Sequence, residues 1–190
     1  MKNKNVLRYI YNPFEKIAGW RALISGLIIV FLSGWIGKQA NLMFDGAIDA
    51  HFGKEVTYYQ TFMMLFIDVA CVGVVMYLAG LVVSRNFRFI DLLGTMTLAR
   101  APYLLLSVSG LFVTVPETAE LLANPALIFS NPGFLIFITL SFPAIIWVIA
   151  LMYNAWKVST GAKGPKMIIT FIAGLFAAEV ISKILISILF

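Results

Sequence analysis

Asp68, Glu179 and Lys183 are ionisable residues that lie inside long apolar segments of the sequence. A charge at the centre of a bilayer costs about 2.5–3.5 kcal/mol on insertion scales, so charges found there usually pair or mark an ion path. Glu179 precedes Lys183 by four residues, which is the favourable order for an ion pair on one face of a helix. The pattern favours an intramembrane polar cluster that neutralises itself, and passage of ions or protons is the alternative.

The depths of these residues predict how they meet. Asp68 lies about 7 residues after the start of its apolar segment, and Lys183 about 7 residues before the end of its own. In antiparallel helices both would lie roughly 10 Å from the same membrane face. Neither charge is tolerable if it faces lipid alone. We therefore expect Asp68 and Lys183 to be neighbours, with Glu179 one turn deeper.

A second polar group falls between the first two apolar segments and consists of Asp45, Asp49, His51 and Glu55. Carboxylates at this spacing can bind a hard divalent cation, and the imidazole would favour a transition metal. A dedicated transition-metal site normally recruits further His or Cys ligands, but His51 is the only histidine of the chain. The sequence therefore favours a solvated acidic loop without metal or cofactor, and metal binding is the alternative.

Three arginines precede or open the third apolar segment: Arg85, Arg88 and Arg100. Arg85 and Arg88 alternate with Phe87 and Phe89, and a basic and aromatic strip at a membrane face is typical of contact with anionic lipid headgroups. The long side chain of Arg100 can reach the same headgroups by snorkelling, and the alternative is that it caps a helix break before Pro102. We expect all three arginines to contact lipid, and we expect no nucleic acid partner.

The chain lacks the sequence motifs of common enzyme classes. It has no Gly-x-Ser-x-Gly motif, no paired histidines on a helix and no phosphate-binding glycine loop. An intramembrane protease would need a Ser–His pair or two aspartates within its spans, and Asp68 is the only aspartate inside an apolar segment. We expect the protein not to be an enzyme.

Composition defines the elements that must position these residues. Apolar residues make up 61% of the 190 residues and charged residues 12%, whereas soluble domains have about 45–50% apolar and 25% charged residues. A spanning helix needs about 20 apolar residues. The sequence predicts an all-α membrane protein in which residues 1–190 form a single domain with a five-transmembrane-helix bundle. The predicted spans cover residues 20–37, 61–84, 95–116, 133–156 and 165–190. The start of the third span is left open between Asp91 and Ala101.

Residues 1–19 precede the first predicted span and mix basic with apolar residues. Within 6–19 the apolar residues recur at helical spacing: Leu7, Ile10, Tyr11, Phe14 and Ile17. This pattern is typical of a helix that lies in the membrane interface. The sequence predicts an N-terminal interfacial amphipathic helix, followed by a first span that is retained and not cleaved as a signal peptide.

The distribution of charge predicts the orientation. Eleven of the 14 basic residues fall in the N-terminal region, at the start of the first span, or in the connections 85–100 and 157–166. The other two connections hold five acidic residues: Asp45, Asp49, Glu55, Glu117 and Glu120. Because Lys-rich and Arg-rich loops remain in the cytoplasm, we expect an N-in, C-out topology in the cytoplasmic (inner) membrane.

Three stretches of the chain resemble the Yip1 family of integral membrane proteins. Residues 11–16 (YNPFEK) are similar to the amphipathic lead-in of the family, and 89–102 (FIDLL to LARAP) resemble the segment before its third span. Residues 147–163, from Trp147 through YNA to STGAK, resemble the end of its fourth span and the loop behind it. The resemblance covers nearly the whole chain and implies a fold of five transmembrane helices.

The resemblance implies a membrane protein without defined chemistry. Eukaryotic relatives are associated with vesicle trafficking and Rab-type small GTPases, and they carry a long cytoplasmic N-terminal region that is missing here, so we do not expect small-GTPase binding. We expect a membrane-organising or partner-binding protein whose partners are membrane lipids, a second copy or another membrane protein. The alternative is a small ion or solute channel or transporter whose path passes Asp68, Glu179 and Lys183.

Overall fold

The computed structural model describes residues 9–53, 56–114 and 118–190, and it is an antiparallel helical bundle. Five helical segments are long and apolar enough to cross a membrane. They are α2 (Gly19–Gln39), α3 (Tyr58–Val83), the pair α4 (Phe89–Leu98) and α5 (Pro102–Gly110), α8 (Pro132–Thr160) and α9 (Pro165–Leu189). The predicted all-α fold with five candidate spans is confirmed at this level.

Local chemistry explains where several of the helices begin and end. Thr57 and Gln60 form a capping box at the start of α3, which satisfies two backbone N–H groups that have no partner inside the helix. The Asn131 side chain accepts from the Phe134 N–H at the start of α8. At the other end of α8, Gly161 adopts φ +63°, a left-handed conformation that favours glycine. These signals come directly from the sequence.

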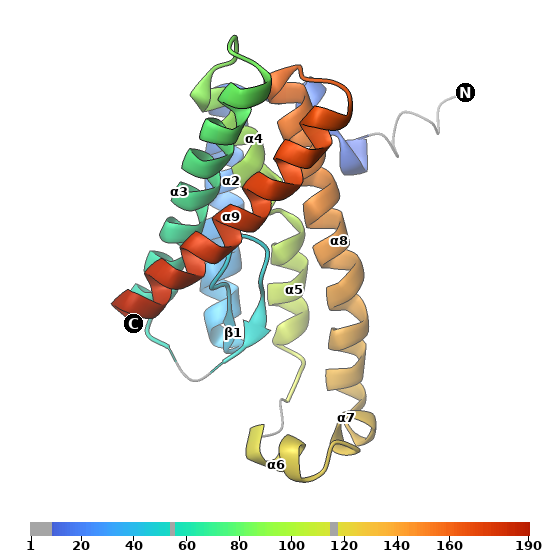
Figure 1. Ribbon diagram of the computed structural model, residues 1–190. Helices are drawn as coiled ribbons and strands as arrows, with labels where there is room; N and C mark the ends of the chain where they lie inside the picture. The colour runs from blue at the N-terminus through green and yellow to red at the C-terminus, as the bar shows by residue number, and fades with distance from the viewer. Residues whose placement is uncertain (1–8, 54–55, 115–117) are drawn as a thin grey trace, which may run out of the picture.

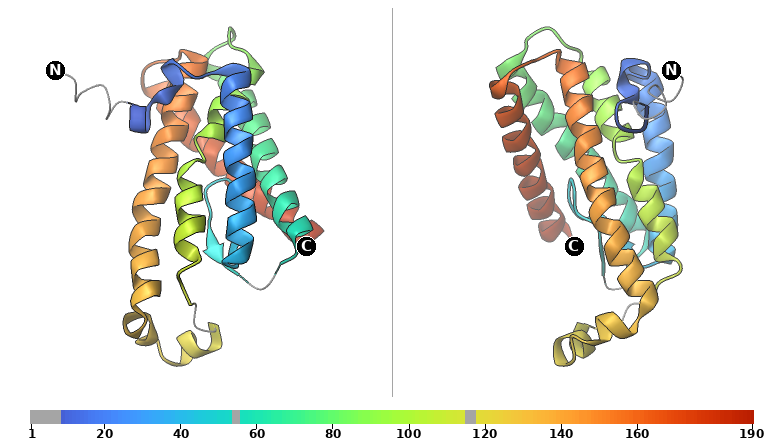
Figure 2. Two further views of the ribbon diagram at one scale, coloured as in Figure 1. Left: turned by 180° about the vertical axis from the view of Figure 1, so that it is seen from behind. Right: turned by 90° about the vertical axis from the view of Figure 1, so that its right-hand side faces the viewer.

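The third candidate span is the most buried of the five and lies between its neighbours. It packs against α2 on one side and α8 on the other, while α9 packs along α3 (Figure 1, Figure 2). The α3–α4 and α8–α9 connections lie at one end of the bundle, which we call the basic end. At the opposite end α2 ends and α3 begins, α5 ends and α8 begins, and the short helices α6 (Thr118–Ala123) and α7 (Leu127–Ser130) extend beyond the bundle.

Close approach of α2 and α4 depends on glycine. An ideal Cβ on Gly26 would lie 2.6 Å from the backbone nitrogen of Leu98, and one on Gly94 would lie 2.5 Å from the carbonyl oxygen of Gly19. No side chain fits at either distance, so the two backbones touch directly, as small residues allow in membrane helices.

The third span differs from its predicted bounds of 95–116. The helical segment runs over Phe89–Gly110, and residues 111–114 are not helical. It is also broken in two at residues 99–101. Pro102 has no N–H to donate to the preceding turn, and the chain at the break makes three-residue turns, with Ala101 N donating to the Leu98 carbonyl.

The continuous amphipathic helix predicted for residues 6–19 is not formed in the described residues, which begin at residue 9. Residues 9–11 form a helical turn, and η1 (Pro13–Glu15) is a short 3₁₀ turn. Asn12 and Pro13 interrupt the helix because proline disfavours helical geometry in the residue before it. The segment is held against α8: Trp147 Nε1 donates to the Ile10 carbonyl at 2.8 Å, and Phe14 is buried.

Gly26→Ala should lower the free energy of unfolding by about 1–3 kcal/mol, because α2 and α4 must move apart to admit the Cβ. Gly73→Ala is a matched control in α3, since a Cβ there would meet only the end of the Leu93 side chain, which can rotate away. Thermal unfolding in detergent measures both variants. Equal losses would show that the α2–α4 backbone contact does not limit stability.

Candidate functional site

Arg100 occupies the break between α4 and α5, deep inside the bundle. It is the twelfth of the 22 residues of the third candidate span, and its side chain is 1% exposed. The prediction that Arg100 contacts lipid headgroups is therefore wrong. The error follows from the bounds of the span, because a helix that begins at Phe89 puts Arg100 near its middle and not at its start.

The guanidinium of Arg100 binds three groups from two other segments. Its Nη2 lies 3.3 Å from Asp68 Oδ2 on α3, and Asp68 is fully buried. Nη1 donates to the Ala47 carbonyl at 2.9 Å, and Nη2 donates to the Gly46 carbonyl at 3.4 Å. A buried ion pair needs such additional hydrogen bonds to offset the loss of hydration. Arg100 therefore joins α3 to the connection between α2 and α3.

That connection enters the bundle as a hairpin. Two short strands, β1 (Leu42–Met43) and β2 (His51–Phe52), pair with Leu42 opposite Phe52. The segment between them rises beside α5 toward the middle of the bundle (Figure 1, Figure 2). Phe44 and Ala47 in this segment are buried, and the Phe44 ring lies 5.2 Å from that of Tyr103. We call residues 42–52 the re-entrant hairpin.

Glu179 on α9 holds the opposite side of the re-entrant hairpin. Its Oε2 accepts from the Ile48 N–H at 2.9 Å. An ideal Cβ on Gly46 would lie 2.5 Å from Glu179 Oε1, so the carboxylate rests against the bare backbone at this position. Gly46 therefore lies between Arg100, which binds its carbonyl, and Glu179.

Lys183 pairs with carboxylates near the end of the bundle and not with Asp68. Its Nζ lies 2.5 Å from Asp49 Oδ2 and 3.5 Å from Glu179 Oε1. The predicted ion pair between Asp68 and Lys183 is wrong, because each of them has another partner. Counting depth in residues placed Asp68 and Lys183 at one level, but the count ignored Arg100 and the re-entrant hairpin, which lie between the helices and supply those partners.

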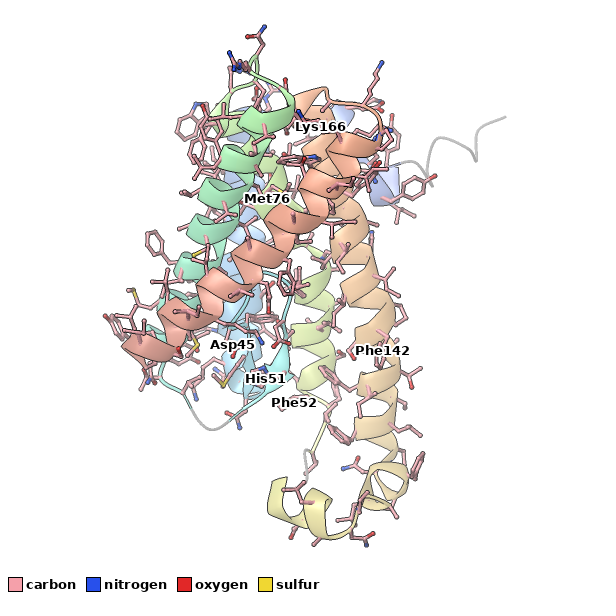
Figure 3. The ribbon with its side chains drawn as sticks, viewed as in Figure 1. Asp45, His51, Phe52, Met76, Phe142 and Lys166 are labelled. Carbon is pink, nitrogen blue, oxygen red and sulfur yellow. The ribbon has the colours of Figure 1, made fainter. Side chains whose placement is uncertain are left out.

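Asp45 and His51 lie near each other in Figure 3, and Asp49, which belongs to the same group, pairs with Lys183 on α9. His51 Nδ1 lies 3.2 Å from Asp45 Oδ1 and 3.8 Å from Asp49 Oδ2. Each of these residues offers one ligand atom, and the three atoms lie within 4.8 Å of one another, so together they could hold a metal ion. Glu55, the fourth residue of the predicted group, lies outside the described residues. The two carboxylates are only partly exposed and face the cations His51 and Lys183, so this loop is not the freely solvated one that the sequence favoured.

The charges of this group reinforce one another. Hydrogen bonds to Asp45 and then to Asp49 raise the pKa of His51 from 6.5 to about 10, against the opposing effect of burial. The hydrogen bond from His51, assisted by Lys183, holds the pKa of Asp49 well below its usual range. His51 is therefore protonated and Asp49 ionised at neutral pH. Asp49 lies between His51 on β2 and Lys183 on α9, and its contacts with both link the strand to the helix.

Arg85 and Arg88 lie at the surface of the basic end, as predicted for residues that contact headgroups. Both are exposed, and Arg88 also pairs with Asp91, with Nε 2.7 Å from Oδ2. Contact with lipid itself stays a prediction.

Three buried polar atoms around Arg100 have no hydrogen-bond partner within the described part of the chain. They are Asp68 Oδ1, Arg100 Nε and the hydroxyl of Tyr103. Buried polar groups normally bind protein, water or a ligand. The interior around Asp68 and Arg100 therefore has unused donors and acceptors that can bind a small polar group.

Arg100→Gln should lower the free energy of unfolding by about 3–5 kcal/mol, because it leaves Asp68 buried without a cation. Adding Asp68→Asn should recover part of that loss, so the double variant is more stable than the sum of the single losses predicts. Arg88→Gln, which breaks an exposed pair, should change stability little. Detergent unfolding curves of the four variants provide the measurement, and strictly additive losses would contradict the pairing.

The contact of His51 with Asp45 and Asp49 should weaken at alkaline pH. A folded pKa of about 10 against 6.5 means that protonated His51 stabilises the fold fully below about 6.5, and this contribution disappears as the pH rises through about 10. Because His51 is 45% exposed, the effect should be small. The difference in melting temperature between the wild type and His51→Gln should narrow over this range. A constant difference would contradict the assignment.

Comparisons with protein-family models, with curated proteins and with solved structures each find no match to this chain.

Proposed function

We propose that the protein is a multi-pass protein of the cytoplasmic membrane that binds lipids and membrane partners, and that it neither catalyses a reaction nor transports a solute. The resemblance to the Yip1 family, which stays a prediction, agrees with this role as a membrane-organising or partner-binding protein. Five helices are long and apolar enough to span a bilayer, and they support a location of this binding in the membrane.

The observation that carries the proposal is the pairing of the charges that lie within the candidate spans. Asp68 is neutralised by Arg100, and Glu179 by Lys183. Arg100 and Glu179 also bind the backbone of the re-entrant hairpin. Transport sites usually keep polar groups facing a water-filled path, whereas these groups bind the protein itself. The polar core therefore supports a structural task, in which it fixes the re-entrant hairpin within the bundle.

The basic end supports an N-in, C-out orientation. With Arg100 inside the bundle, ten of the 14 basic residues still belong to the N-terminal region, the start of α2 and the two connections of this end. Positive charge in short loops favours the cytoplasmic side, and it also attracts the anionic lipids of that leaflet.

A groove between α2 and α3 supports binding within the membrane. It has a volume of about 470 Å³ and an entirely apolar lining: Leu27, Ile28, Val30, Phe31, Leu32, Phe62, Leu65, Phe66 and Val69. It lies along two candidate spans, at the depth of the hydrocarbon in the proposed orientation. An acyl chain is the occupant that this chemistry suits, because the lining offers no polar group to a headgroup.

A small channel or transporter is the alternative function. Transporters often place broken helices around a site near the membrane centre, and the third candidate span is broken beside Arg100. The unpartnered atoms of Asp68, Arg100 and Tyr103 would lie in such a site.

Ion flux separates the two functions. Liposomes that contain the purified protein and an ion-sensitive dye should show no more flux than protein-free liposomes, because the buried charges are engaged with one another. Glu179→Gln should leave that result unchanged. Flux that Glu179→Gln abolishes and Lys166→Gln preserves would contradict the proposal and favour the channel.

A further inference from the structure

The connection between α8 and α9 forms a pocket of about 360 Å³ at the basic end. Tyr153 and Lys157 line it from the last turns of α8, and Lys163 lines it from the connection. Met167 and Ile168 line it from the first turn of α9. Two lysines and a set of apolar side chains therefore line the same pocket.

Backbone geometry brings the two lysines together. Gly161 ends α8 at φ +63° and Gly164 precedes α9 at φ +83°, and both values lie in the left-handed region that L side chains rarely adopt. Pro165 then starts α9 with its φ already fixed. The chain reverses within four residues, 161–164, and this turn puts Lys163 at the same pocket that Lys157 lines from α8.

The charge of the pocket has no internal partner. No acidic residue lines it, and among the described residues neither Lys157 nor Lys163 forms an ion pair, in contrast to Lys183, which has two. Both lysines are exposed. An anion that enters the pocket would meet two positive charges that no acidic side chain of the described residues neutralises.

The lower wall suits the apolar part of the same ligand. Met167 is buried and Ile168 is 43% exposed, and the Tyr153 ring packs edge-on against Phe171 on α9, with ring centroids 5.5 Å apart. Below this level α8 and α9 continue as apolar candidate spans. A ligand with an anionic head and an apolar tail therefore matches the pocket, because the lysines suit the head and the apolar side chains suit the tail.

We propose that this pocket binds the headgroup of an anionic phospholipid in the cytoplasmic leaflet, with Lys157 and Lys163 on the phosphate and the acyl chains along α8 and α9. Basic pockets between helices on the cytoplasmic side are typical binding sites for such headgroups. The proposal rests on the proposed function, since it names the lipid class that the protein binds. It differs from general surface attraction because it assigns the binding to two of the basic residues of this end.

Native mass spectrometry of the full chain in detergent tests the site with two probes that share their acyl chains, phosphatidylglycerol and phosphatidylcholine. The wild type should bind phosphatidylglycerol more tightly. Lys157→Gln/Lys163→Gln should weaken phosphatidylglycerol binding about thirtyfold, since each lysine near an anionic membrane surface contributes about fivefold. Phosphatidylcholine binding should stay the same.

Arg21→Gln/Lys166→Gln is the matched control, because it removes the same charge from the basic end outside the pocket. Lys166 is adjacent to the connection (Figure 3) but does not line the pocket. This control should weaken phosphatidylglycerol binding by less than about twofold. Lys157→Arg/Lys163→Arg should restore binding, and melting temperatures identify any variant that is misfolded.

Three results would overturn the proposal. Equal losses in the two Gln double variants would mean that net charge acts without a defined site. Equal binding of the two lipids by the wild type would exclude recognition of an anion. If inorganic phosphate displaced phosphatidylglycerol at an equal concentration, the pocket would be a phosphate site to which the acyl chains contribute nothing. None of these results bears on the ion-flux measurement, so failure here and failure of the proposed function are distinguishable.

Discussion

A guanidinium buried in the middle of a helical bundle constrains everything around it. The cost of removing a guanidinium from water must be offset by a nearby carboxylate and by hydrogen-bond acceptors. One helix cannot supply these groups, because its carbonyls are already used within the helix. Asp68 on α3 provides the carboxylate, and Gly46 and Ala47 provide two free carbonyls. Arg100 thus requires both a broken span and a connection that leaves the surface.

The re-entrant hairpin is tolerable for the same reason. Irregular backbone at membrane depth is found only where protein surrounds it and satisfies its polar groups. On one side of the hairpin Arg100 donates hydrogen bonds to its carbonyls. On the other side Glu179 accepts a hydrogen bond from the Ile48 N–H. Gly46 lets both approach, since any side chain there would collide with the Glu179 carboxylate. At the base of the hairpin, Lys183 on α9 pairs with Asp49. His51 pairs with Asp45 within the hairpin itself.

The helices were predictable because long apolar runs and capping residues are local properties of a sequence. The third span was harder: Asp91, Thr95 and Thr97 lower the apolar signal over its first half, although the two threonines are buried and bind backbone carbonyls of their own helix. Starting the span too late moved Arg100 to a membrane face and left Asp68 without its partner. The hairpin could not be inferred from periodicity, since its burial depends on groups from three distant segments. Leu42, Phe44 and Ile48 were the available clue, because a solvated loop rarely carries so many apolar residues.

Charged residues of this chain fall into two kinds, and the difference bears on function. Those inside the bundle are engaged with other charges or with backbone, so removing one disturbs the fold and reveals little about binding. Lys157 and Lys163 are engaged with nothing that the described chain provides, and neither is needed to neutralise a neighbour. Lys157 lies in the last turn of α8, where a cation is favourable, but two like charges at one pocket repel each other. The backbone nevertheless brings them to one pocket through two left-handed glycines. An external anion would remove that repulsion, and a lipid phosphate is the anion that a membrane presents at this level.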